Sequence, residues 1–277
     1  MAKPLISALE LQARLDDVDV VVIDSRWYID DSSAGRRAYD EAHIPGARFV
    51  DLDTDLSQAT GPGRHPLPTH QAFGEICGRL GIDQNTHVVV YDDRGGGIAA
   101  RMWWMLTNQG HPAVSVLDGG LDAWTAIEGP MTNEPPSVEL AALPTQPWAR
   151  TVDINDVENR PETTMLIDAR ASERYRGDEE PIDPVAGHIP GAMSMPLDDN
   201  LNPDMTFKDP AALSQRFVSA GIEDAQDVIV HCGSGVTACH NILAMVLAGI
   251  PPADLYVGSW SDWSSAGMPV AIGDNPR

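Results

Sequence analysis

The pentapeptide His-Ile-Pro-Gly-Ala at residues 43–47 recurs letter for letter at residues 188–192, which is 145 positions further along the chain. Residues 22–26 (Val-Ile-Asp-Ser-Arg) are similar to residues 166–170 (Leu-Ile-Asp-Ala-Arg). Residues 88–92 (Val-Val-Val-Tyr-Asp) are similar to residues 228–232 (Val-Ile-Val-His-Cys). The matches keep the same order in both halves. Collinear repetition at a slowly drifting separation indicates that the chain contains two copies of one folding unit.

Both halves alternate short β-branched runs with longer stretches of helical periodicity, which is the pattern of βα units. Parallel strands joined by helices form a sheet that is covered on both faces. We therefore predict an α/β protein with two tandem domains, each a parallel sheet with helices on both faces. In the second half, the predicted strands lie near residues 164–168, 192–195, 227–231 and 254–257, and the predicted helices include residues 210–220 and 236–248.

The stretch between the two halves has a different composition. Residues 131–150 are rich in Pro, Thr and small side chains and follow neither the helical nor the strand period. This composition is typical of a linker. We predict an N-terminal domain over residues 1–130, a linker over residues 131–150 and a C-terminal domain over residues 151–277.

Charge and cysteine content limit the compartment and the partners. The 277 residues include 18 Lys and Arg against 41 Asp and Glu, a formal net charge of -23, which disfavours nucleic acid and anionic membranes as partners. The three cysteines, Cys77, Cys232 and Cys239, form no disulfide framework, so a reducing compartment is favoured. The sequence starts without a leader pattern, and no apolar run reaches the roughly 18 residues that span a bilayer. We expect a cytoplasmic protein.

The residues that carry chemistry follow the predicted strand at 227–231. Cys232 is followed by Gly233, Ser234, Gly235, Val236 and Thr237, and the next residues have a helical pattern. In a parallel sheet, ligands bind where a strand ends and a loop leads into a helix. Two glycines allow amide N–H groups to converge near the helix N-terminus, which would favour a thiolate and could hold the outer sulfur of a persulfide. The alternative is that Cys232 is an inert core cysteine.

This loop resembles the active-site loop of the rhodanese superfamily. Its sequence is more similar to that of the mercaptopyruvate sulfurtransferases than to that of the thiosulfate sulfurtransferases. The resemblance extends over nearly the whole chain, including residues 117–121 (Leu-Asp-Gly-Gly-Leu), residues 258–261 (Gly-Ser-Trp-Ser) and Trp263. It implies a catalytic C-terminal domain and a silent N-terminal copy, in which Asp92 lies opposite Cys232. Cys77 falls on a predicted helix and is interpreted as a packed small hydrophobe.

The resemblance also implies an activity. A sulfane sulfur would move from 3-mercaptopyruvate or thiosulfate, both small anions, to a thiophilic acceptor through a persulfide on Cys232. The implied acceptors are cyanide or a thiol, including that of a thioredoxin-like protein. No cofactor and no metal are expected.

By position in the family, Arg174 is the arginine that binds the anionic donor, and Arg176 is the nearby alternative. A guanidinium suits either donor, although an ordinary surface ion pair is the competing interpretation for each. Mercaptopyruvate enzymes carry a second arginine after a Glu-Pro pair, whereas here Glu180-Pro181 is followed by Ile182. Thiosulfate enzymes carry two cationic residues directly after the cysteine, where this chain has Gly and Ser. Both donors therefore remain open.

Ser234 could bond the leaving group or help to move a proton. In the family, a histidine of the repeated motif has been assigned a partnering role, and by position this residue is His43. The alternative is structural, because His188 occupies the same place in the other copy. Trp260 and Trp263 could line the site, although packing between helix and sheet is the commoner use of tryptophan.

Three other interpretations compete. His231, Cys232, Cys239 and His240 might suggest a zinc site, but their spacing sends the side chains in different directions. A cysteine phosphatase of the same fold would need an arginine where this chain has Ala238. A sulfur carrier that relays persulfide between protein partners is compatible with the intact cysteine loop.

Overall fold

The computed structural model describes residues 2–222 and 227–274, and the chain divides into two compact units. The first unit contains residues 1–58, 67–149 and 203–207, and the second contains residues 59–66, 150–202 and 208–277. Residues 131–149 thus belong to the first unit. The short segment 59–66 belongs to the second unit although it comes from the first half of the sequence. The prediction of consecutive domains did not include this.

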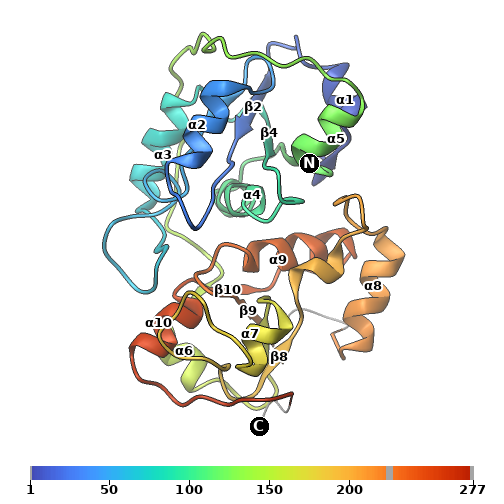
Figure 1. Ribbon diagram of the computed structural model, residues 1–277. Helices are drawn as coiled ribbons and strands as arrows, with labels where there is room; N and C mark the ends of the chain where they lie inside the picture. Colours follow the sequence, from blue (N-terminus) through green and yellow to red (C-terminus); the bar gives the residue numbers. More distant parts are fainter. Residues whose placement is uncertain (1, 223–226, 275–277) are drawn as a thin grey trace. The chain divides into compact units, whose positions relative to one another are not determined.

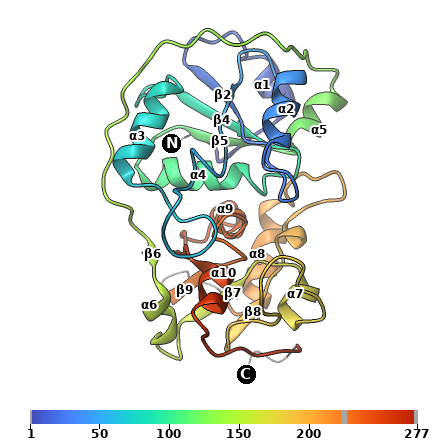
Figure 2. The ribbon, with the colours of Figure 1, turned by 60° about the vertical axis from the view of Figure 1, so that its left-hand side comes forward.

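The first unit is a five-stranded parallel sheet in the order β1-β5-β4-β2-β3. Figure 2 shows α1 and α5 on one face of this sheet and α4 on the other. The strands are β1 (Leu5–Ile6), β2 (Val20–Asp24), β3 (Arg48–Phe49), β4 (His87–Tyr91) and β5 (Val114–Leu117). The helices are α1 (Ala8–Gln12), α2 (Ala34–Glu41), α3 (His70–Arg79), α4 (Ala99–Asn108) and α5 (Gly120–Ala126).

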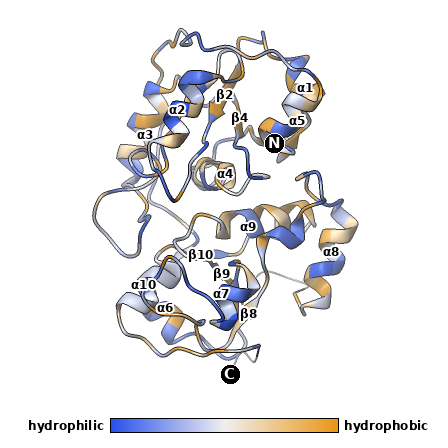
Figure 3. Ribbon diagram, in the orientation of Figure 1, coloured by the Kyte–Doolittle hydropathy of each residue, from blue (hydrophilic) through white to orange (hydrophobic). Residues whose placement is uncertain are grey.

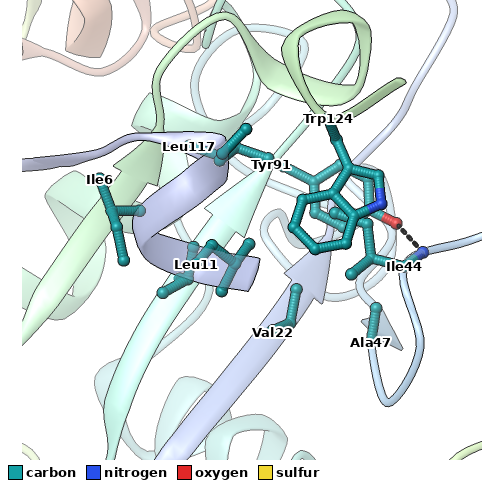
Figure 4. Packing of buried hydrophobic residues seen from close by; sticks show 10 residues of the cluster. Ile6, Leu11, Val22, Ile44, Ala47, Tyr91, Leu117 and Trp124 are labelled. Atoms are coloured by element: carbon teal, nitrogen blue, oxygen red, sulfur yellow. Dashed lines mark hydrogen bonds between the residues drawn. The ribbon is translucent and has the colours of Figure 1, made fainter. Parts of the chain in front are cut away.

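The core beneath α1 and α5 is built from alternate residues of the strands, as expected for a buried sheet face. Figure 4 shows Trp124 of α5 and Leu11 of α1 gathered over Val22 and Tyr91. The Tyr91 hydroxyl accepts a hydrogen bond from the Ile44 amide at 3.3 Å. The apolar residues of the repeated motif, Ile44 and Ala47 in the first unit and Ile189 and Ala192 in the second, are in the two cores, so the repeat marks a shared packing arrangement.

The second unit repeats this topology strand for strand, in the order β6-β10-β9-β7-β8, again entirely parallel. The predicted strands and helices of this half are present within two residues of their expected bounds (Figure 1). The strands are β6 (Thr151–Val152), β7 (Met165–Asp168), β8 (Ala192–Ser194), β9 (Val228–His231) and β10 (Asp254–Tyr256). The helices are α6 (Ile154–Glu158), α7 (Ser172–Arg176), the 3-10 helix η1 (Leu197–Asn200), α8 (Pro210–Ser219), α9 (Ala238–Leu247) and α10 (Ser259–Ser265).

Helices cover both faces of the second sheet. Val157 of α6, Tyr175 of α7 and Trp260 and Trp263 of α10 form one core cluster against the strands. On the other face, α9 packs on β9 and is apolar along much of its length (Figure 3). No helix in the described residues combines the length and the apolar character needed to cross a membrane. The prediction of two parallel-sheet domains is confirmed.

Candidate functional site

The cysteine loop, residues 232–237, joins the carboxyl end of β9 to the start of α9. β9 lies between β10 and β7, so this end is at the middle of the sheet. The Gly235 amide donates a hydrogen bond to Sγ of Cys232 at 3.1 Å. Gly235 has a φ of +75°, and a Cβ there would lie 2.4 Å from the Val257 carbonyl oxygen. Glycine is therefore required for the turn that aims this amide at the sulfur.

The start of α10 fixes the loop from the other side. The Cys232 amide donates to Oγ of Ser259 at 3.2 Å, and the Trp260 amide donates to the Cys232 carbonyl at 3.0 Å. The Ser261 amide donates to the Gly233 carbonyl at 2.9 Å. Ser259 itself has a φ of +55°, an unusual conformation for a residue with a side chain. The backbone of Cys232 and Gly233 is thus held by two main-chain hydrogen bonds and by the side chain of Ser259.

The equivalent loop of the first unit shows what this backbone shape binds. There the fully buried carboxylate of Asp92 accepts hydrogen bonds from four backbone amides, those of Arg94, Gly96, Ile98 and Ala99, at 2.7–2.9 Å. Amides converging on one point form an anion-binding nest. In the first unit this loop is therefore an anion cradle, and its own side chain supplies the anion.

In the second unit, a shift of 140 positions places Cys232 where Asp92 stands. The corresponding amides of Ser234, Val236 and Ala238 have no acceptor within the described part of the chain. The fourth, that of Cys239, bonds the Val236 carbonyl at 3.1 Å. The sequence predicted several amides around the thiol. Among the described residues, the Gly235 amide donates a hydrogen bond to the sulfur.

The thiol of Cys232 is 1% exposed, yet its surroundings are polar. They differ from those of Cys77, which is fully buried on α3, where burial raises the pKa of the thiol. Desolvation without compensating dipoles disfavours a thiolate. The interpretation of Cys77 as a packed hydrophobe is therefore confirmed, whereas Sγ of Cys232 accepts a hydrogen bond from the Gly235 amide.

Arg174 and Arg176, the two predicted donor-binding residues, occupy different surroundings. A Cβ on Gly233 would lie 3.5 and 3.7 Å from the two Nη atoms of Arg174, so this guanidinium stands beside the cysteine loop. It is held by Glu180 at 2.6 Å and Asp183 at 3.1 Å. Arg176 instead pairs with Asp178 at 2.7 Å on the surface. The structure brings Arg174 to the loop and leaves Arg176 in a surface ion pair.

Two residues at the loop were missed by the sequence analysis, and both lie in the segment 59–66. His65 Nδ1 is 2.8 Å from Oγ of Ser234, and the two side chains are 6% and 7% exposed. Arg64 Nη2 would lie 3.0 Å from a Cβ on Gly233. The available signal was a cation and a histidine directly after the sequence Gly61-Pro62-Gly63 in an acidic chain, but no hydrophobic periodicity predicts where this segment lies in the fold.

His43 has a structural environment, and its predicted role as a partner of Ser234 finds no support. Its Nδ1 donates to the Tyr39 carbonyl at 2.7 Å, its Nε2 is 3.2 Å from the Glu134 carbonyl, and its ring stacks on Tyr39 at 4.0 Å. His188 repeats this arrangement, with Nδ1 2.8 Å from the Tyr175 carbonyl and the rings 3.8 Å apart. The same contacts in both copies identify a shared folding device.

A buried charge network supports β9 and β7 behind the loop. Arg170 binds Asp168 through a forked pair, with the shorter bond 2.7 Å, and lies 4.6 Å from the Trp260 ring. Burial lowers the pKa of His231. Burial opposes ionisation of Asp168, but His231 and Arg170 outweigh it and hold the pKa of Asp168 at about 2. Trp260 therefore packs against a structural cation. No set of three metal-binding side chains comes together in the described residues.

A family model described as "Rhodanese-like domain" matches the chain twice, over residues 7–127 and over residues 153–266. "Probable 3-mercaptopyruvate sulfurtransferase" of Pseudomonas aeruginosa is 44% identical over 280 residues, which is 98% of this chain and 98% of that protein. Thiosulfate sulfurtransferase of Mus musculus is 38% identical over 255 residues, which is 87% of this chain and 84% of that protein.

A solved structure is also similar over its full length. SseA from Escherichia coli, described with the rhodanese fold and the catalytic mechanism of 3-mercaptopyruvate sulfotransferases, has a TM-score of 0.78 and 33% identity. The similarity covers 94% of this chain and 100% of that chain. Both units are thus matched by the family model, and relatives are matched over most of their length.

Proposed function

The chain belongs to the rhodanese family, and from that membership we propose that it is a sulfurtransferase whose carrier is a persulfide on Cys232. The observation that carries this proposal is the pair of duplicated loops. In one loop, four amides bind the carboxylate of Asp92, and in the other the Gly235 amide donates to Sγ of Cys232. A loop shaped for an anion, with sulfur at its centre, suits a thiolate and its negatively charged persulfide.

The reaction has two halves. The Cys232 thiolate attacks the sulfane sulfur of the donor, so that a sulfur–sulfur bond forms while the donor's bond to that sulfur breaks. Thiosulfate releases sulfite. With 3-mercaptopyruvate, the carbon keeps the electron pair and takes up the proton of the donor thiol, which releases pyruvate. A cyanide or thiolate acceptor then bonds the outer sulfur and regenerates the Cys232 thiolate.

The donor is proposed to be 3-mercaptopyruvate or thiosulfate, and one contact favours the first. Cleavage of mercaptopyruvate moves a proton from sulfur to carbon, whereas cleavage of thiosulfate moves none. The His65–Ser234 pair, with Nδ1 2.8 Å from Oγ beside the sulfur carrier, is built to move such a proton. For the acceptor we propose cyanide or a thiol, including that of a thioredoxin-like protein. The three free cysteines suit a reducing, cytoplasmic setting.

Incubation with donor alone is expected to leave one sulfur atom on the protein. The measurement is the intact mass before and after incubation, followed by peptide mapping of the modified residue. We expect the added sulfur on the peptide that contains Cys232, and thiocyanate in equal amount when cyanide is added. Sulfur on Cys239, or turnover with no protein-bound sulfur, would contradict the proposal. Tight binding of a protein partner with negligible turnover of both donors would instead indicate a sulfur carrier.

Replacing His65 with Gln is expected to reduce kcat with 3-mercaptopyruvate by about 10²-fold, because a proton relay contributes on that order. With thiosulfate, which needs no proton transfer, we expect less than about a 5-fold change. Ser234→Ala should show the same donor dependence, and the double variant should be no slower than the slower single variant. Equal losses with both donors would show that the pair acts by holding the loop.

A further inference from the structure

The residue directly before Cys232 differs from its counterpart in the first unit. β4 and β9 occupy the same place in the two sheets, and they end in Tyr91 and His231. Tyr91 is in register with Asp24, and His231 is in register with Asp168. All four side chains are fully buried. Polar atoms at such depth are expected to have hydrogen-bond partners, so the change from phenol to imidazole needs compensation.

In the first unit, one hydroxyl oxygen satisfies two buried groups. The Tyr91 hydroxyl donates to Oδ2 of Asp24 at 2.7 Å. It also accepts from the Ile44 amide at 3.3 Å (Figure 4). The oxygen therefore joins the strand end to a carboxylate and to the repeated motif.

The second unit has the same carboxylate and the same amide, contributed by Asp168 and Ile189. The backbone around them matches the first unit closely. In each unit, the amide three residues after the isoleucine donates to the isoleucine carbonyl at 2.9 Å. The aspartate carbonyl accepts from the segment after the repeated motif, at 2.9 Å in the first unit and 2.8 Å in the second. The Ile189 amide thus has the position relative to Asp168 that the Ile44 amide has relative to Asp24.

The imidazole of His231 does not reach these partners. Its Nε2 is 3.8 Å from Oδ2 of Asp168, which is too long for a hydrogen bond, and it has no other partner among the described residues. The amide of Ile189, a fully buried residue, also lacks an acceptor in the part of the chain that the structure describes. Buried groups of this kind are usually satisfied by an ordered water molecule.

The donor and acceptor roles can be assigned from the other side of the ring. Nδ1 of His231 is 3.2 Å from the Cys232 carbonyl, which can only accept, so Nδ1 carries a proton. Burial lowers the pKa of His231, so the ring is neutral at neutral pH and Nε2 is an acceptor. Two acceptors, Nε2 and Oδ2 of Asp168, therefore lie close to one donor, the Ile189 amide. A water molecule, with two protons and a lone pair, satisfies all three.

We propose that one buried water molecule is bound between Asp168, His231 and Ile189, at the place that the Tyr91 hydroxyl takes in the first unit. The water donates to Oδ2 of Asp168 and to Nε2 of His231, and it accepts from the Ile189 amide. Imidazole and water together thus replace a phenol. The bound water joins the strand end before Cys232 to the repeated motif. This inference does not depend on the sulfur transfer proposed above.

A high-resolution crystal structure of the wild-type protein is the direct test. We expect one peak of water density within about 2.7–3.2 Å of the two side-chain atoms and the amide nitrogen. Nitrogen-15 NMR of the His231 ring at neutral pH should show a neutral imidazole with its proton on Nδ1. A well-ordered His231 without density at that place would overturn the proposal, as would any other protonation state of the ring.

His231→Tyr and His231→Phe form a matched pair of variants that differ by one oxygen atom. Tyrosine should place its hydroxyl at the position of the water, as Tyr91 does, whereas phenylalanine would leave the Ile189 amide without an acceptor. We expect the melting temperature of His231→Phe to be roughly 3–8 °C below that of His231→Tyr. Tyr91→Phe should lower the melting temperature by a similar amount.

Equal melting temperatures for His231→Tyr and His231→Phe would overturn the proposal, because a hydroxyl at this place would then have no partners. The crystal structure and the NMR measurement use the wild-type protein, so they decide the question even if neither variant folds. Both readouts are independent of turnover. A failure of the proposed sulfur transfer would therefore leave the water site standing, and a failure of the water site would leave the persulfide chemistry intact.

Discussion

Cys232→Ser is expected to lower the rate of thiocyanate formation by at least about 10³-fold with either donor, because the nucleophile is lost. A serine hydroxyl ionises far less readily than a thiol at neutral pH, and its oxygen cannot form a persulfide. The loop should nevertheless keep its shape. Its bonds to α10 run through the main chain of Cys232 and Gly233, which the substitution leaves in place. The measurement is the initial rate at saturating cyanide, with the melting temperature recorded in parallel.

The other two cysteines provide the controls for this variant. Cys239 is the second residue of α9, with its thiol 3.5 Å from the Gly235 carbonyl, and Cys77 is in the first unit. We expect Cys239→Ser and Cys77→Ser to lose stability through burial of a hydroxyl but to keep kcat within about 3-fold at a temperature where they are folded. A Cys232→Ser protein with a substantial share of the wild-type rate would refute the assignment of the carrier.

The features that could be predicted from the sequence are those that neighbouring residues determine. A β-branched run such as that of Val228–His231 predicts a buried strand whatever its place in the sheet. A Gly-rich turn directly after the strand predicts the cysteine loop. The internal repeat predicted in addition that both halves have the same fold, because two copies of one pattern fold alike. Arg174 was identified through the resemblance to the rhodanese superfamily, and the structure places it on α7, the helix after β7.

The features that were missed depend on long-range contacts. His65 and Ser234 are 169 positions apart in sequence, and their contact exists because the segment 59–66 belongs to the second unit. The segment contains no helix or strand, so hydrophobic periodicity carries no information about its place. It is positioned by close backbone contacts: a Cβ on Gly63, whose φ is +73°, would lie 2.4 Å from the Gly258 carbonyl oxygen. Such contacts depend on the complete fold, so they cannot be predicted from the sequence of the segment.

His43 was a candidate only by its position in the repeated motif, and its contacts with Tyr39 and Glu134 fit the structural alternative. A residue repeated in both copies is explained by what the copies share, which is their fold. If catalysis is confined to one copy, as we propose, its residues are expected where the copies differ. His65 and Arg64 lie in a segment that the internal repeat does not include, and Asp92 and Cys232 are the clearest difference between matched strands. Within a duplicated protein, departures from the repeat are therefore the better guide to function.

Asp92→Ala is expected to lower the free energy of unfolding of the first unit by about 3–5 kcal/mol. Four amides converge on this fully buried carboxylate, and the smaller side chain would leave all four without an acceptor. Urea unfolding followed by far-UV circular dichroism measures the loss.

Asp92→Asn tests the cause of this effect. The amide oxygen can accept from one pair of N–H groups, but the NH₂ group would face the N–H groups of Ile98 and Ala99, which are now bonded to the second carboxylate oxygen at 2.7 and 2.8 Å. We therefore expect an intermediate loss. Asp122→Ala, which changes a carboxylate on α5 that accepts no hydrogen bond in the described residues, should cost less than about 0.5 kcal/mol. If Asp92→Ala lowered the free energy of unfolding no more than Asp122→Ala, the loop would not be an anion cradle. The comparison between the carboxylate in one copy and the proposed persulfide in the other would then lose its physical basis.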